Sequence, residues 1–89
     1  MSAPLSSVVV LAYRQFEQTT LPCLRSLSPW FDDLDFEFIV WDNASPDHSG
    51  ALAQDWCKAY PRVRFEQSAS NLGYAGGMHA AAALATGTW

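Results

Sequence analysis

Three short apolar runs alternate with helical patterns along this chain, and a polar cluster follows each run. The runs are Ser7–Tyr13, Phe36–Trp41 and Val63–Gln67. Their β-branched and aromatic residues are typical of strands. Because helical patterns separate them, the element order is β-α-β-α-β-α, which predicts an α/β fold with a three-layer, Rossmann-like parallel sheet.

The strand patterns differ in the burial that they predict. Val8–Ala12 is apolar throughout, which indicates a strand covered on both faces, as in a parallel sheet. Residues 63–66 alternate apolar and charged side chains, which indicates an edge strand.

The first helical pattern lies within Phe16–Leu27, where leucines recur at three-residue spacing. Such spacing places the leucines on one face of a helix. Because Pro22 has no N–H to donate, it belongs in the first turn. The regular helix is therefore expected to begin near Thr19 or Thr20 and to end at Ser28-Pro29.

The second and third helical patterns follow the second and third strands. Asp47 or Ser49 is expected to cap the second helix, and Pro61 to stop it. The third helix is expected over Ala75–Ala85, with Gly87 as its terminator. The apolar face of the second helix is expected to comprise Leu52, Ala53, Trp56, Cys57 and Tyr60.

This topology brings the three polar clusters together. Right-handed crossovers between parallel strands put the first two helices on one face of the sheet, and the third helix is expected on the opposite face. All three clusters then lie at the carboxyl edge, where open α/β sheets bind ligands. The reversal of the chain beside the first strand predicts a crevice at that end.

Asp42 is the most informative polar residue, because it comes at the tip of an apolar strand. It is either a solvated carboxylate at a strand end or an acceptor for the N3–H of a pyrimidine base. Asn43 either reads a base carbonyl or braces the loop as a turn residue. Tyr13, at the end of the first strand, is either a half-buried aromatic or a ring that stacks on the base.

In the third polar cluster, the groups expected to contact a ligand belong mainly to the backbone. Asn71 and Gly73 form either a plain turn, with Gly73 at positive φ, or a backbone approach to ribose or phosphate. Gly76 and Gly77 let the main chain come close to a ligand at a helix entry, and His79 could donate to it. Neither a G-x-G-x-x-G fingerprint nor a P-loop occurs in the sequence.

Composition limits the classes of partner. The 89 residues allow one small domain, and the 49% hydrophobic content argues against disorder. The net charge is −4, and the five basic residues form no patch with interleaved aromatics, so nucleic acid is not an expected partner. An anionic ligand would need positive charge from a metal ion or from backbone N–H groups.

The cysteines and the longest apolar run bear on the compartment. Cys23 and Cys57 have neither zinc-site nor disulfide-framework spacing, so both are expected to be reduced core thiols of a cytoplasmic protein. No signal-peptide pattern or membrane-spanning run is found. Asp33-Leu34-Asp35 has the D-x-D pattern of a metal site, but it precedes the second strand and therefore belongs at the amino edge, away from the crevice.

The order and spacing of these motifs resemble the N-terminal segment of a family 2 glycosyltransferase of the GT-A fold. The resemblance covers nearly the whole chain. It is carried by VVVLAY at 8–13, TLPCLRSL at 20–27, FIVWDNASPD at 38–47 and NLGYAGG at 71–77.

The resemblance implies a nucleotide-sugar donor of UDP or dTDP type and an inverting transfer to an acceptor hydroxyl. Tyr13 would border the base, Asp42 would hold the pyrimidine edge, and Asn71 with Gly73 would line the path of ribose and diphosphate. The donor-binding residues that it implies are Ala12, Tyr13, Arg14, Asp42, Asn43, Asn71, Gly73, Gly76 and His79.

The family also uses a catalytic base and a D-x-D motif that holds Mg²⁺ or Mn²⁺, both of which follow the segment seen here. Residues 1–89 are therefore expected to be a single truncated segment that holds half of a donor site, no catalytic residue and no metal ligand, and is inactive alone. Arg14 and Met78-His79 differ from the residues that are usual at these positions in the family. The parent is expected in the cytoplasm or at the inner face of the membrane.

Two alternatives remain open. One is a catalytically silent module that binds a nucleotide or a protein; the other is an unrelated flavodoxin-like domain such as a signalling receiver, for which Tyr13-Arg14 lacks the acidic pair. In the family's strand order, the first strand pairs with a fourth. Ser7–Tyr13 is therefore expected to form an open apolar edge that joins a second copy by pairing or strand exchange.

Overall fold

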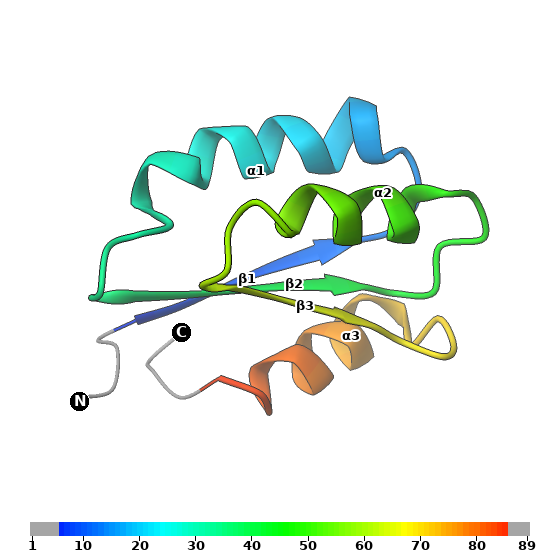
Figure 1. Cartoon of the computed structure of the whole chain (residues 1–89). Helices are drawn as coiled ribbons and strands as arrows, with labels where there is room; N and C mark the ends of the chain where they lie inside the picture. Colours follow the sequence, from blue (N-terminus) through cyan, green and yellow to red (C-terminus); the bar gives the residue numbers. More distant parts are fainter. Residues whose placement is uncertain (1–5, 86–89) are drawn as a thin grey trace.

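The computed structural model of the chain describes residues 6–85, in which three parallel strands lie between two layers of helices (Figure 1). The predicted β-α-β-α-β-α order is confirmed. The elements are β1 (Ser6–Ala12), η1 (Phe16–Thr20), α1 (Leu21–Leu27), η2 (Ser28–Trp30), β2 (Phe36–Asp42), α2 (Ser49–Cys57), β3 (Val63–Gln67) and α3 (Gly73–Ala82).

The sheet has the order β1-β2-β3, with β2 in the centre. Both pairings are parallel; Val10 lies opposite Val40, which lies opposite Phe65 on the other side. The prediction that β3 is an edge strand is confirmed. Helical segments contact β1 from both faces of the sheet, η1 on one and α3 on the other (Figure 1). The burial predicted for Val8–Ala12 is nevertheless incomplete, because β1 is also an edge strand: Val8, Val9 and Leu11 are only half-buried, whereas Phe38–Val40 in β2 is buried throughout.

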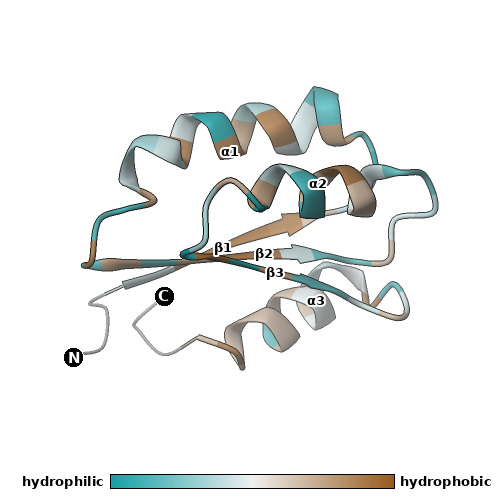
Figure 2. Cartoon of the chain, viewed as in Figure 1, coloured by the Kyte–Doolittle hydropathy of each residue, from teal (hydrophilic) through white to brown (hydrophobic). Residues whose placement is uncertain are grey.

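The helices cover the two faces as the topology predicts. Helices α1 and α2 lie on one face and α3 on the other (Figure 1). Helix α3 contacts β1 and β2 and is coloured mostly white to light brown, because alanines and glycines dominate it (Figure 2). Its small side chains let it approach the sheet closely, and Ala81 is completely buried.

The helix bounds differ from the expected ones at several ends. A π-helical turn, η1, precedes α1 and begins at Phe16; Pro22 is the second residue of α1, so its place in the first turn is confirmed. The helical path then continues through Ser28-Pro29 as the 3-10 turn η2, because proline is tolerated in a first turn. Helix α3 begins at Gly73 and ends at Ala82, and Gly87 lies outside the described residues.

The main core lies between the sheet and the α1–α2 layer. Phe31 packs at its centre, with its ring centroid 4.8 Å from Phe38 and 4.9 Å from Tyr60. Leu52, expected on the apolar face of α2, is instead exposed. The buried residues of this core are Val10, Phe16, Leu24, Phe31, Phe38, Val40, Ala53, Cys57 and Val63.

The two cysteines have different environments. Cys57 is in the core, and burial raises the pKa of its thiol to about 11. The expectation of a core position is wrong for Cys23, which is exposed. Neighbouring residues on a helix point about 100° apart, so Cys23 lies off the stripe whose next member, Leu24, is fully buried.

The amino edge of the sheet is closed by Arg62. Its guanidinium donates to the carbonyl oxygens of Phe31, Asp33 and Phe36 at 3.0–3.3 Å. Asp35 also accepts the N–H of Ser6 through its carbonyl oxygen, so the D-x-D pattern does lie at this edge. Within residues 6–85, no helix has the length and apolarity needed to cross a bilayer.

Candidate functional site

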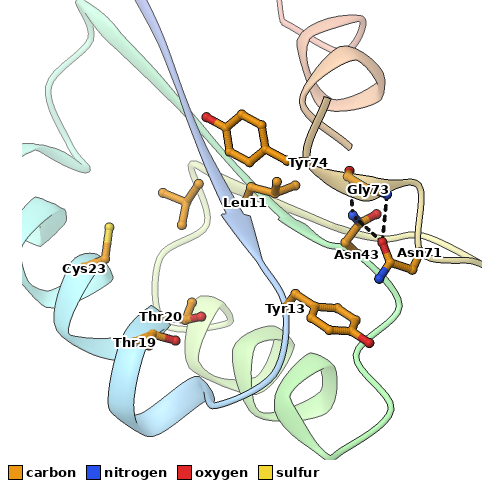
Figure 3. Close-up of a pocket in the computed structure, with 10 residues that line it drawn as sticks. Leu11, Tyr13, Thr19, Thr20, Cys23, Asn43, Asn71, Gly73 and Tyr74 are labelled. Atoms are coloured by element: carbon orange, nitrogen blue, oxygen red, sulfur yellow. Dashed lines mark hydrogen bonds between the residues drawn. The ribbon is translucent and has the colours of Figure 1, made fainter. Parts of the chain in front are cut away.

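A hollow of about 420 Å³ lies around the carboxyl end of β1. It reaches both sides of the strand: Thr19, Thr20 and Cys23 stand on one side, and Asn43, Asn71 and Gly73 on the other (Figure 3). The residues that line it are Val10, Leu11, Tyr13, Thr19, Thr20, Cys23, Asn43, Asn71, Gly73 and Tyr74. Four of the nine predicted donor-binding residues are therefore brought together, namely Tyr13, Asn43, Asn71 and Gly73.

Tyr13 presents its ring to this hollow. It follows the last residue of β1 directly and is 41% exposed. The guanidinium carbon of Arg14 lies 5.2 Å from the centroid of the Tyr13 ring, within the range of a cation–π contact. An aromatic face and a positive charge thus stand together where β1 ends.

Asn43 braces the loop before α3. Its side-chain nitrogen donates to Asn71 Oδ1 at 3.1 Å and to the carbonyl oxygen of Gly73 at 3.0 Å, as Figure 3 shows. Its side-chain oxygen accepts the N–H of Leu72 at 3.2 Å. Of the two roles predicted for Asn43, the structure displays loop bracing, and its amide is occupied by these bonds.

Asp42 does not line the hollow. It is the last residue of β2 and 0% exposed. Its Oδ2 accepts the N–H of Ser45 at 2.9 Å and the Gln67 amide at 3.2 Å, while its Oδ1 accepts the Ser45 hydroxyl at 2.6 Å. The carboxylate is thus held by three hydrogen bonds within the chain. The interpretation of Asp42 as a solvated carboxylate is wrong, because the residue is fully buried, and a contact with a base stays a prediction.

The loop after β2 holds the loop after β1 through three hydrogen bonds. The consecutive N–H groups of Arg14, Gln15 and Phe16 donate to alternate side chains of the later loop, at 2.8–3.2 Å. The acceptors are Ser45 Oγ, Asp47 Oδ2 and Ser49 Oγ. We refer to Ser45, Asp47 and Ser49 together as the clamp.

The clamp holds a strained segment. Arg14 and Gln15 both have left-handed backbones, with φ of 59° and 51°, and each such residue other than glycine costs about 1–2 kcal/mol. Asp47 also accepts the N–H of Ser49, the first residue of α2. The prediction that Asp47 or Ser49 is the N-cap of this helix is wrong, because the N-cap is His48, which makes no side-chain capping hydrogen bond. Hydrogen bonds from Ser49 and Gln15, aided by the charge of Arg14, lower the pKa of the Asp47 carboxyl.

Gly50 and Gly77 lie where neighbouring side chains leave no room for a Cβ atom. The sequence alone did not indicate these contacts. A Cβ on Gly77 would lie 2.8 Å from Leu11 Cδ1 and 3.1 Å from the side-chain nitrogen of Asn43. A Cβ on Gly50 would collide with the Gln67 amide that donates to Asp42. Their only sequence signal is a glycine inside a helical pattern, where glycine is unfavourable without a packing reason.

The other predicted site residues lie outside the wall of the hollow. Ala12 is buried and accepts the N–H of Asn43 through its carbonyl oxygen. His79 is exposed on α3, and a Cβ on Gly76 would meet Leu72. Arg14 flanks Tyr13. Within residues 6–85, no three His, Cys, Asp or Glu side chains converge as metal ligands, so the described residues do not fit a divalent cation.

Comparison with known proteins links this geometry to one family. The family model described as Glycosyl transferase family 2 matches residues 7–89. No curated protein matches the sequence.

Among solved structures, the chain is similar to a mannosyltransferase from Pyrobaculum calidifontis in complex with GDP-Man and Mn²⁺. The TM-score is 0.70 at 21% identity, which shows a shared fold. The match covers 96% of this chain and 25% of the mannosyltransferase. The chain therefore spans a minor part of that protein's length, and the predicted α/β fold of GT-A type is confirmed.

Proposed function

The chain belongs to glycosyl transferase family 2, and from this membership we propose that it forms the donor-binding part of an enzyme that moves a sugar from a nucleoside-diphosphate sugar to an acceptor hydroxyl, with inversion. The observation that carries the proposal is the hollow at the carboxyl end of β1, where Tyr13, Asn71 and Gly73 meet. This is the end at which parallel α/β sheets bind ligands.

The lining suggests a role for each part of the donor. The Tyr13 ring stacks on the base, with Arg14 adding positive charge beside it. The turn at Asn71–Gly73, held by Asn43, offers backbone to the ribose and diphosphate. We propose a UDP- or dTDP-type donor, with Asp42 selecting a pyrimidine, either by contact after a rearrangement of its hydrogen bonds or through the residues that it holds.

The chemical step requires groups that residues 6–85 do not offer. Mg²⁺ or Mn²⁺ would supply positive charge to a departing diphosphate, but no described cluster fits such an ion. We therefore propose that the chain alone binds the nucleotide without transferring sugar, and that other residues of a longer enzyme provide the metal site and the base.

Binding of nucleotides to the purified chain tests the proposal. Titration calorimetry with UDP, dTDP and GDP, with and without Mn²⁺, should show weak binding of one pyrimidine nucleotide that is independent of the metal. Cys23 gives a second readout, because it lines the hollow while Cys57 is buried with a raised pKa. Bound nucleotide should slow the alkylation of Cys23 by about tenfold at 90% occupancy.

Two variants control this experiment. Tyr13→Ala should weaken binding without altering the fold, since Tyr13 is outside the core, whereas Tyr60→Phe should bind as the wild type does. Absence of both calorimetric heat and protection of Cys23 with every nucleotide would overturn donor binding. It would favour the alternative of a catalytically silent protein-binding module.

We further propose that the edge of β1 that no strand within residues 6–85 pairs with joins a second copy of the chain. The Ser6 N–H and the Ala12 carbonyl bond to residues at the two ends of β2, so in a parallel ladder the backbone groups of Val9 and Leu11 face away from the sheet. Strand β1 carries no charged side chain, and unprotected apolar edges promote pairing.

Light scattering over a range of concentrations tests this pairing. The mass should rise toward twice that of one chain, and Val9→Lys should shift the equilibrium toward the monomer, because a lysine on an edge strand disfavours pairing. Arg64→Ala on β3 serves as the control on the opposite edge. A constant monomer mass at millimolar concentration would contradict the proposal.

A further inference from the structure

We infer that Ser45 and Asp47 are positioning residues of the donor site, which act by fixing the backbone that carries Tyr13 and Arg14. Neither residue lines the hollow. The inference rests on the proposed function, because it assigns the clamp a purpose in nucleotide binding. It also makes a conformational claim that stands or falls without any nucleotide.

The first support is the conformation that the clamp maintains. Two consecutive residues with left-handed backbones follow Tyr13, and neither is a glycine. Such a pair needs compensation from its surroundings. Ser45 and Asp47 each accept the N–H of one of the two, Arg14 and Gln15 respectively, so each strained residue has its own acceptor.

The second support is that further hydrogen bonds hold the Ser45 hydroxyl, which accepts the Arg14 N–H, in place. The Ser45 hydroxyl accepts from Arg14 and donates to Asp42, and the Ser45 N–H donates to the same carboxylate. Gln67, at the end of β3, donates to Asp42 as well. A hydrogen-bond chain thus runs from β3 through the end of β2 to the backbone beside Tyr13, and it fixes Ser45 from the protein interior.

The third support is what a relaxed loop would do to the hollow. If Arg14 and Gln15 moved to right-handed backbone angles, the chain would leave β1 in another direction. The Arg14 guanidinium would then leave the Tyr13 ring, and the backbone that follows Tyr13 would no longer hold that ring in place beside Asn71 and Gly73. Binding sites lose affinity when such supports are removed, even though the supports never contact the ligand.

The third clamp residue provides an internal contrast. Ser49 accepts the N–H of Phe16, which is buried and already within the helical turn η1. Its loss should therefore lower stability through an unsatisfied buried N–H. The acceptors of Arg14 and Gln15 remain in place, but Asp47 loses the Ser49 side chain as a hydrogen-bond partner, so the Gln15 amide should shift less than it does in Asp47→Ala. Ser49→Ala separates a general structural effect from a positioning effect.

The experiment compares Ser45→Ala, Asp47→Ala and Ser49→Ala in the full chain. The dissociation constant for the nucleotide that the wild type binds among UDP, dTDP and GDP is measured by calorimetry. The Arg14 and Gln15 amide resonances are followed by ¹H–¹⁵N NMR. Ser45→Ala and Asp47→Ala should each weaken binding by about tenfold, the factor that one hydrogen bond of ordinary strength represents, and should shift the amide of the residue released.

Rescue and control variants sharpen the result. Ser45→Thr keeps the hydroxyl and should retain most of the affinity. Gln15→Gly in the Asp47→Ala background should recover part of it, because glycine adopts the left-handed region without strain. Ser28→Ala, which removes a hydroxyl that donates to Arg25 in the neighbouring helix, should leave both readouts unchanged.

The outcomes separate the two claims. Wild-type affinity in folded Ser45→Ala and Asp47→Ala, with shifted amides, would overturn the positioning role while donor binding stands. Unshifted amides would overturn the conformational claim. If the wild type binds no nucleotide, the proposed function fails, and with it the purpose assigned to the clamp; shifted amides would then support the conformational claim alone.

Discussion

Asp42→Ala is expected to lower the free energy of unfolding by about 3 kcal/mol. The side chain is completely buried, and its two oxygens accept three hydrogen bonds from Ser45 and Gln67. Alanine leaves those donors without an acceptor in a space that water enters poorly. The net loss is smaller than three charged hydrogen bonds would suggest, because the folded chain no longer buries a carboxylate.

Chemical denaturation followed by tryptophan fluorescence measures this loss. Asp55→Ala is the matched control: its carboxylate is exposed and pairs only with Lys58, so a change within about 0.5 kcal/mol is expected. The stability loss of Asp42→Asn should lie between those of Asp42→Ala and Asp55→Ala. The asparagine side chain keeps one acceptor oxygen, but its NH₂ group faces the remaining donors. Equal stabilities of Asp42→Ala and the wild type would contradict the buried network.

The expected loss of stability complicates the interpretation of nucleotide binding by Asp42→Ala. A loss of binding in Asp42→Ala would follow from a contact with the base, and equally from a collapse of the loop that Ser45 supports. Binding by Asp42→Ala must therefore be measured without denaturant, at a temperature at which the variant is shown to be folded. The clamp variants keep the Asp42 carboxylate. They therefore separate the loss of a contact with the base from a collapse of the loop.

Phe31→Ala is expected to lower the free energy of unfolding by about 4 kcal/mol. The ring is only 2% exposed and lies at the centre of the main core, in edge-to-face contact with Phe38, Tyr60 and Trp56. A domain of this size has a total stability of roughly 4–13 kcal/mol. The loss of one ring would thus remove a large share of it and leave a partly unfolded population.

The same denaturation experiment tests this prediction against Leu34→Ala. Leu34 is close in sequence but 75% exposed, so its removal should change stability by less than about 0.5 kcal/mol. Phe31→Leu should recover part of the loss by filling some of the cavity. A loss below about 1 kcal/mol for Phe31→Ala, within the range of ordinary surface changes, would contradict its central place in the core.

The strands and their order could be predicted because period and residue type determine them locally. Val63–Gln67 was predicted with its observed bounds, and β2 differs only by the inclusion of Asp42. Burial of β1 could not be predicted from its own residues, because it depends on which strand lies beside it. The common face of α1 and α2 followed from the handedness of the crossovers, and α3 was expected on the opposite face, where it lies (Figure 1).

The site was harder to predict, because its residues act through tertiary hydrogen bonds. Arg14 and Gln15 carry no signal for a left-handed backbone, and the acceptors that hold them are about thirty positions away. The sequence places Asp42 at the end of a strand, but its burial depends on Gln67 and on the close approach of α2 at Gly50. Tyr13, Asn71 and Gly73 could be grouped in advance because parallel topology alone places them at one edge.

The two edges of the described sheet differ in how readily they would accept a further strand. At β3, Arg64 and Glu66 form an ion pair along a short strand, which discourages further strand addition. Two chains joined symmetrically through β1 would expose only their β3 edges. Growth would then stop at a closed pair with twofold symmetry, and the chain would be protected from extending into open-ended fibres.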